Sequence, residues 1–255
     1  MIALLLLPRE EGPNPEGLRE TLEGHFKASA SCAVDRTHSA IHMSVAGEEV
    51  AAAVKERPVE QDLLSGPLSE AWYWPEAEEV ARAHRSHVAV VVRGAFDPSN
   101  AVERALLLTR VAALLAEGLG ATGLYWDGST SLHSPEALLE SAREMRPDLL
   151  PLRLWVAFRT QTSSEESEER RTGLFTAGLD ALGHREIEIR GSARPREEIS
   201  GWAYDVAHYI LKERVVLKHG EAVGKSPTEW CRVYVVPSSV DPHREVYLLD
   251  LEAEE

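Results

Sequence analysis

Residues 172–191 read TGLFTAGLDALGHREIEIRG, in which a glycine-punctuated apolar segment runs directly into an alternating charged one. Gly183 is placed to end a short helix, because glycine readily adopts the left-handed conformation that closes helices. The alternation beyond it separates two isoleucines from three charged residues on a strand: Ile187 and Ile189 against Glu186, Glu188 and Arg190. The stretch therefore predicts a helix-to-strand junction with one buried and one solvated face. Whether the charged face meets water, Arg159 or a partner stays open.

Strand-like and helical runs alternate over nearly the whole chain, which is typical of a layered protein. We expect an α+β fold of mixed sheets covered by helices. Pro147 and Pro151 bracket a break in the pattern, which predicts an N-terminal half, 1–147, and a C-terminal half, 148–255, within one compact unit. Each half can be written strand, helix, strand, helix, strand. An internal duplication of ferredoxin-like character is therefore a hypothesis.

Capping residues mark several helix starts, with Asn14 before Pro15, Pro75 at another start, and Ser134 before Pro135. A helix within 197–213 carries an apolar stripe of Ile199, Trp202, Ala203, Val206 and Ile210. The strand candidates are residues 2–7, 41–45, 87–94, 121–129, 152–160, 214–220, 230–239 and 244–251. Residues 161–171 are rich in serine and glutamate, which predicts a solvated loop.

The chain of 255 residues carries a net charge of −15, from 42 acidic and 27 basic side chains. Such a surface repels phosphate backbones and anionic lipid headgroups, so we expect neither a nucleic acid nor a membrane as partner. A protein of basic or mixed charge suits it better. The apolar run that follows Met1 lacks a basic flank and a cleavage site, and nothing reaches membrane-span length.

Two cysteines, Cys32 and Cys231, stand far apart and outside any metal-binding spacing. Buried thiols in a reducing compartment are the expectation, and together with the absence of a leader they predict a cytoplasmic protein.

The familiar catalytic motifs are incomplete. His184 and Glu186 have the H-x-E spacing of zinc deaminases, but the required P-C-x-x-C pair is missing. Serines lie near His133 without a G-x-S-x-G elbow, and residues 220–226 are one glycine short of a phosphate-binding loop. An acid–base cluster of Tyr204, Asp205 and His208 falls off the apolar stripe of its helix, where a solvated face is commoner. We therefore predict no catalytic residue, no metal site and no cofactor.

The aromatic residues are more informative than the histidines. Trp72, Tyr73 and Trp74 precede a helix, and Trp126 ends a strand beside Asp127. Large aromatic side chains either close a core or anchor a partner, and both alternatives stay open here. The candidate binding residues are Trp72, Trp74, Trp126, Asp127, Arg159, Glu186 and Glu188.

The order of several segments resembles the bacterial domain-of-unknown-function family 4261, over a span from about Trp72 to Val246. The segments are WPEAEEVARAHRSHVAVVV, ERALLLTRVAALL, LPLRLWVAF, RRTGLFTAGLDALGHREIEIRGS and VAHYILKERVVLKHGEAVG. The most specific residues are Thr176, Gly178, Leu179, Gly183, Glu186, Ile187 and Glu188, followed by the turn His219, Gly220, Glu221 and by Gly224. The resemblance implies a soluble, stand-alone bacterial α and β domain with no established reaction or ligand.

Two functions follow as expectations. The first is a non-catalytic protein-binding domain, immunity-like or regulatory, which the acidic surface and the missing motifs favour. The second is an enzyme or small-ligand binder with a pocket at the strand ends, lined by Tyr125, Trp126, Asp127, Arg159, Glu186 and Glu188.

Overall fold

A computed structural model describes residues 1–162, 171–226 and 229–252 of the chain. The chain forms two compact units, Met1–Leu154 and Trp155–Glu255. A single helical turn, α6 (Leu152–Trp155), spans the junction between them, a few residues after the break predicted at Pro147. Each unit is described by itself below.

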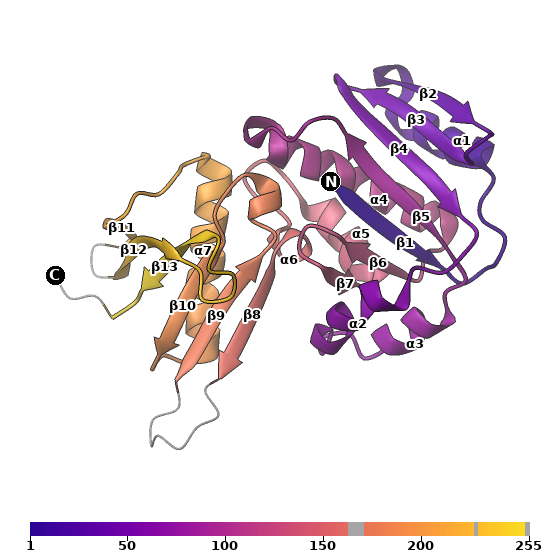
Figure 1. Ribbon diagram of the computed structural model, residues 1–255. Helices are drawn as coiled ribbons and strands as arrows, with labels where there is room; N and C mark the ends of the chain where they lie inside the picture. Colours follow the sequence, from indigo (N-terminus) through magenta and orange to yellow (C-terminus); the bar gives the residue numbers. More distant parts are fainter. Residues whose placement is uncertain (163–170, 227–228, 253–255) are drawn as a thin grey trace. The chain divides into compact units, whose positions relative to one another are not determined.

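The first unit contains a seven-stranded sheet in the order β2-β3-β4-β5-β1-β6-β7 (Figure 1). Every neighbouring pair in it is antiparallel. The strands are β1 (Ile2–Leu7), β2 (Ala30–Asp35), β3 (Ala40–Val45), β4 (Glu48–Lys55), β5 (Ser86–Arg93), β6 (Gly123–Trp126) and β7 (Ser131–His133). The helices are α1 (Pro15–Phe26), α2 (Gln61–Glu70), α3 (Ala77–Ala83), α4 (Ala101–Leu119) and α5 (Pro135–Glu144), with short 3₁₀ turns at Lys27–Ser29 and Pro98–Asn100.

The caps predicted at Asn14 and Ser134 are confirmed, whereas α3 begins at Ala77, two residues after the start predicted at Pro75. The Asn14 side chain accepts a hydrogen bond from the Glu16 amide, and that of Ser134 from the Ala137 amide. Each satisfies an amide that has no partner within its helix. Gly120 ends α4 in the left-handed conformation.

Helices lie against both faces of the seven-stranded sheet. Helix α4 packs along β1 and β5, with α1 and α5 beside it, while α2 contacts β7 and α3 contacts β6 (Figure 1). The second group closes a core of Leu6, Val59, Leu64, Ala71, Trp74, Ala77, Tyr125 and Leu132. This double coverage explains why β1 and β5 read as apolar runs without alternation.

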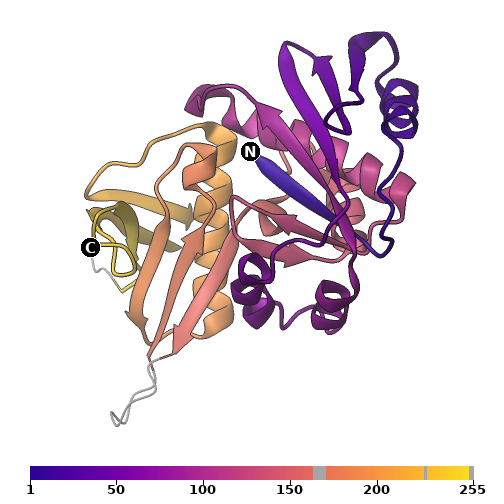
Figure 2. The same ribbon diagram turned by 45° about the vertical axis from the view of Figure 1, so that its right-hand side comes forward.

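The second unit contains a six-stranded sheet in the order β11-β12-β13-β10-β9-β8. The strands are β8 (Ala157–Thr162), β9 (Thr172–Ala177), β10 (Ile187–Ser192), β11 (Glu221–Ser226), β12 (Glu229–Pro237) and β13 (Glu245–Asp250). Helix α7 (Arg196–Glu213) lies along β8, β9 and β10 (Figure 2). Its predicted stripe is confirmed, because all five residues are buried. A 3₁₀ turn, η3 (Asp180–Leu182), precedes Gly183, which has the predicted left-handed conformation.

The α+β class is confirmed, with two corrections to its details. The first sheet is antiparallel throughout, and only the second is mixed, through the parallel pair of β10 and β13. The two strand orders differ and neither follows the strand, helix, strand, helix, strand pattern, so the units do not repeat one ferredoxin-like topology.

Two strand predictions are wrong at particular residues. Residues 152–155 form α6, where Leu152, Leu154 and Trp155 are all buried without alternation. Residues 214–220 contain no strand, because Arg214 caps α7 in the left-handed conformation and the chain has no ladder neighbour before Glu221. In the predicted loop 161–171, Gln161 and Thr162 belong to β8, and residues 163–170 lie outside the described residues.

Candidate binding surfaces

The register of the six-stranded sheet aligns five side chains in one row across it. The row consists of Arg159 (β8), Phe175 (β9), Glu188 (β10), Leu248 (β13) and Tyr234 (β12). These residues alternate with the ones that face α7, as the ring contact between Phe158 and Tyr204 of α7 shows. Two predicted site residues, Arg159 and Glu188, therefore share this face of the sheet.

Phe175 lies between Arg159 and Glu188 in that row. The Arg159 guanidinium sits 5.9 Å from the centroid of the Phe175 ring. Arg190, not Arg159, forms the ion pair with Glu188, with 2.8 Å between its Nε and the carboxylate. The sequence places the two residues on one face correctly, but they do not pair.

The prediction that Glu188 lies on a solvated strand face is wrong, because only 2 % of this residue is exposed. Its carboxylate accepts hydrogen bonds from Ser238 Oγ at 2.5 Å, from the Ser239 amide at 3.0 Å and from Ser239 Oγ at 2.7 Å. Burial raises the pKa of Glu188, but these hydrogen bonds and the Arg190 contact outweigh it and hold the pKa below its usual value. The buried carboxylate thus fixes the loop that follows β12.

Glu186 lies just before β10 and holds a second loop. Its carboxylate accepts from Thr176 Oγ1 at 2.7 Å, from the Gly178 amide at 2.8 Å and from the Asp180 amide at 3.1 Å. Burial raises the pKa of Glu186, and the hydrogen bonds oppose this shift only in part. Asp180 also pairs with Arg244 at 2.6 Å, which connects the two loops. Both predicted carboxylates therefore have intrachain donors and a structural role.

The serines that bind Glu188 were missed by sequence reasoning. Ser238 and Ser239 follow Pro237 in an ordinary turn composition, and nothing in the pattern connects them with a glutamate fifty residues earlier. Only the pairing of β12 with β13, and of β13 with β10, brings them together.

The tryptophans of the first unit fall into two groups. Trp74 and Trp126 are 8 % and 4 % exposed, and Trp74 belongs to the core beneath α2 and α3. Asp127 is exposed in the turn after β6, where its carbonyl accepts a hydrogen bond from the Thr130 amide. Of these predicted binding residues, the two tryptophans are core residues.

Trp72, by contrast, is 76 % exposed, and its neighbour Tyr73 is 49 % exposed. The two rings meet edge to face, with 5.9 Å between centroids and an angle of 82° between planes. The Tyr73 hydroxyl donates a hydrogen bond to the Leu132 carbonyl at 2.6 Å, which fixes the position of its ring.

Acidic residues surround this aromatic pair in the sequence. Residues 58–81 contain no lysine, arginine or histidine, and carry the exposed acids Glu60, Asp62, Glu70, Glu76, Glu78 and Glu79. Leu63 of α2 is also 41 % exposed. We call Trp72, Tyr73, Leu63 and these six acids the acidic aromatic surface. It combines exposed apolar side chains with negative charge.

The serines near His133 do form a chain of hydrogen bonds. Ser129 Oγ lies 2.6 Å from Ser131 Oγ, which lies 2.8 Å from His133 Nε2. All three side chains are buried, and burial lowers the pKa of His133 to about 4, with the Leu154 carbonyl as a further partner. A backbone carbonyl replaces the carboxylate of a catalytic triad, and neither Ser129 nor Ser131 is exposed. These hydrogen bonds therefore stabilise the turn into β7.

Within the described residues, no group of three or more histidine, cysteine or acidic side chains is arranged to hold a metal ion. His184 is half-buried, and its partner in the H-x-E spacing, Glu186, is already occupied by loop amides. Among the residues that the structure describes, no helix has both the length and the apolar character needed to cross a bilayer.

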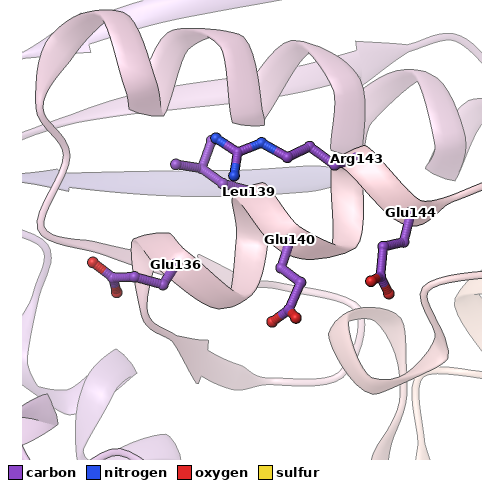
Figure 3. Close-up of a pocket in the computed structure, with 5 residues that line it drawn as sticks. All are labelled: Glu136, Leu139, Glu140, Arg143 and Glu144. Atoms are coloured by element: carbon purple, nitrogen blue, oxygen red, sulfur yellow. The ribbon is translucent and has the colours of Figure 1, made fainter.

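A surface hollow lies on α5, lined by Glu136, Leu139, Glu140, Arg143 and Glu144. Figure 3 shows the three carboxylates on one side of the helix and Leu139 and Arg143 on the other. Arg143 pairs with Glu117 of α4 at 3.7 Å. Since one helix supplies every lining residue, this is an open groove, and it contains none of the predicted pocket residues.

Two of the three residues of the cluster predicted on α7, Tyr204, Asp205 and His208, contact each other. The rings of Tyr204 and His208 stack with 6.4 Å between centroids, and Asp205 is exposed beside them.

The predicted pocket residues fall in different units, with Tyr125, Trp126 and Asp127 in the first and Arg159, Glu186 and Glu188 in the second.

A comparison with protein families bears on the second unit. The family model described as Domain of unknown function (DUF4261) matches residues 175–250, from within β9 to the end of β13. This segment contains the specific residues of the expected resemblance, whereas residues 72–174, over which we expected it to extend, lie outside the match. Searches of curated proteins and of solved structures found nothing that matches the chain. Over residues 175–250 the chain is therefore similar to the family described as Domain of unknown function (DUF4261).

Proposed function

We propose that the protein acts without catalysis, by binding a protein partner of basic or mixed charge in the manner of an immunity or regulatory protein. The observation that carries the proposal is the acidic aromatic surface, with Trp72 76 % exposed. Tryptophan is the residue type most enriched among the side chains that dominate binding energy at protein interfaces.

The backbone around Trp72 is held in place by its buried neighbours. The neighbouring residues Ala71 and Trp74 are buried, and the Trp74 amide donates to the Ala71 carbonyl at 2.9 Å. The backbone of this segment is thereby held in one conformation, so little ordering entropy opposes binding. An exposed aromatic residue on an ordered backbone is what an interface anchor requires.

Charge supports the same partner class. The segment 58–81 is acidic throughout, and the whole chain carries a net charge of −15. A field of this sign accelerates the approach of a basic protein and repels nucleic acids. The pocket alternative has less support, because the carboxylates of Glu186 and Glu188 are occupied by intrachain hydrogen bonds.

Site-specific photocrosslinking tests the proposal. A benzophenone amino acid at position 72 should capture a discrete basic partner in cells, whereas the same group at position 96 should not. Phe96 is a matched control, because it is also an exposed aromatic residue of the first unit, at 59 %. The purified partner should then bind Trp72→Ala about tenfold more weakly than the wild type.

Identical capture from positions 72 and 96, or undiminished binding of Trp72→Ala, would overturn the assignment of this surface. The partner also separates the two kinds of function. A partner that arrests growth alone and is neutralised by co-expression identifies immunity, and a harmless partner whose activity changes on binding identifies regulation.

A further inference from the structure

We propose that the ring of His84 is an acid-sensitive latch, which joins the two ends of the segment that carries the acidic aromatic surface and releases them when the ring becomes protonated. His84 directly follows α3 and is 3 % exposed. Its Nε2 lies 2.8 Å from the amide nitrogen of Val59, just before α2, and its Nδ1 lies 2.6 Å from the carbonyl oxygen of Ala81 in α3. One ring therefore joins the start of α2 to the end of α3.

The two backbone partners determine the protonation state of this ring. A backbone amide can only donate a hydrogen bond, and a carbonyl oxygen can only accept one. The Val59 amide therefore requires a lone pair on Nε2, and the Ala81 carbonyl requires the ring proton on Nδ1. The imidazolium carries protons on both nitrogens, so its Nε2 proton would point at the Val59 amide and the hydrogen bond would be lost.

His87 of β5 makes a neighbouring contact that tolerates protonation. Its Nδ1 lies 2.9 Å from the carbonyl oxygen of Arg57, in the same connection between β4 and α2. A protonated Nδ1 can donate to this carbonyl whether the ring is neutral or charged. Of the two histidines, only His84 therefore loses its bond to the connection in acid.

The charges around the two rings oppose protonation. The charged groups that act on them are cationic: Arg85 on His84, and Lys55, Arg57 and His84 on His87. The carboxylates of the connection, Glu56 and Glu60, belong to exposed residues. Burial is the larger cause and lowers the pKa of His84 from its ordinary value of 6.5. The latch is therefore fully closed above pH 6.5 and opens progressively as the pH falls below it.

The segment between the two ends is weak by itself. Helix α2 contains Gly66 and Pro67, and the side chain of its N-cap residue, Glu60, makes no capping hydrogen bond. Helix α3 has only seven residues. Helices with these features depend on tertiary contacts for their order. Loss of the Val59 hydrogen bond should therefore loosen α2 and α3 before it affects the sheet.

Hydrogen exchange of the full chain, followed by NMR from pH 7.5 to 5.0, tests the inference. Protection factors correct for the intrinsic effect of pH on exchange. Those of Val59 and of the α2 amides should fall by up to about tenfold per pH unit below pH 6.5, the slope for uptake of one proton. Those of Val90, in the buried centre of β5, should fall less. An equal loss at Val90 would mean global unfolding and would overturn the latch.

Two variants separate His84 from its neighbour. His84→Gln can still accept from the Val59 amide but cannot be protonated, so its α2 amides should keep their protection at pH 5.0. His87→Gln is the matched control and should retain the pH dependence of the wild type. If His84→Gln does not fold, the ring ¹⁵N shifts of His84 in the wild type at pH 7.5 decide. A proton on Nδ1 alone supports the latch, and a proton on Nε2 contradicts it.

The latch rests on contacts within the chain, and only its consequence for a partner rests on the proposed function. Photocrosslinking from position 72 should weaken below pH 6.5 in the wild type and persist in His84→Gln. The two failures are distinguishable. Protection that falls with pH while position 72 captures no partner supports the latch and contradicts the proposed function alone.

Discussion

At the scale of single residues, the second unit is organised by two carboxylates that the sequence presents as a solvated strand face. Glu188 is buried and accepts from Ser238, Ser239 and Arg190. A buried charge is tolerated only where donors replace its hydration, and here the donors belong to the loop after β12. The loop and the carboxylate therefore stabilise each other.

Replacing this carboxylate by an amide should destabilise the second unit strongly. Glu188→Gln keeps the volume, but its amide nitrogen cannot accept from Ser239, and we expect a loss of about 2–4 kcal/mol in the free energy of unfolding. Urea denaturation followed by circular dichroism measures it. Glu245→Gln is the matched control, because Glu245 is 60 % exposed and forms a surface ion pair with Arg185. Equal effects of the two substitutions would contradict the structural role of Glu188.

At the scale of elements, the sequence predicts whatever depends on local pattern. Asn14, Ser134 and Gly183 mark helix ends correctly, because capping is decided within a few residues. The strand predicted at residues 214–220 is wrong because strand formation depends on distant residues. Their apolar run resembles a strand, but a strand exists only where a neighbour pairs with it.

The candidate site shows the same division. The sequence identifies Trp72 and Trp74 as notable, but it cannot tell that one is exposed and the other buried. That difference depends on how the connection between α2 and α3 lies on β6, which is a long-range property. Strand order is equally non-local, since β1 pairs with both β5 and β6 across most of the first unit.

The contact between Trp74 and β6 can be tested directly. A Cβ atom at Gly123 would lie 3.0 Å from Trp74 Cη2 and 3.2 Å from Leu6 Cδ1, which is tighter than nine in ten Cβ contacts, so these side chains would have to shift. We expect Gly123→Ala to lower the free energy of unfolding of the first unit by about 1–3 kcal/mol and to displace the α2–α3 connection. Gly17→Ala, in α1 with open space around it, should be neutral or slightly stabilising. Thermal denaturation compares the two, and similar melting temperatures would contradict this packing.

At the scale of the whole molecule, burial of histidines contributes to the response to acid. Burial lowers the pKa of His84, His87, His133 and His184. In three of them the ring has an intrachain partner: His84 Nε2 accepts from the Val59 amide, His87 Nδ1 contacts the Arg57 carbonyl, and His133 Nε2 contacts Ser131 Oγ. Burial disfavours the charged form of each of these rings, so protonation opposes folding. Glu186 acts in the opposite direction, because its raised pKa makes the folded chain bind a proton more readily than the unfolded chain.

The largest single effect belongs to His133, whose pKa falls from 6.5 to about 4 on folding. As the pH falls below 6.5, the unfolded chain takes up this proton first, so the contribution of His133 is complete above pH 6.5 and is lost progressively toward pH 4. The full loss amounts to about 3 kcal/mol. Urea denaturation of wild type and His133→Gln from pH 7.5 to 4.5 should show a shallower pH dependence in the variant, whereas His243→Gln, at an exposed position, should follow the wild type. Because wild type and His133→Gln share every titrating group except His133, parallel curves for these two proteins would show that His133 is not buried in its neutral form.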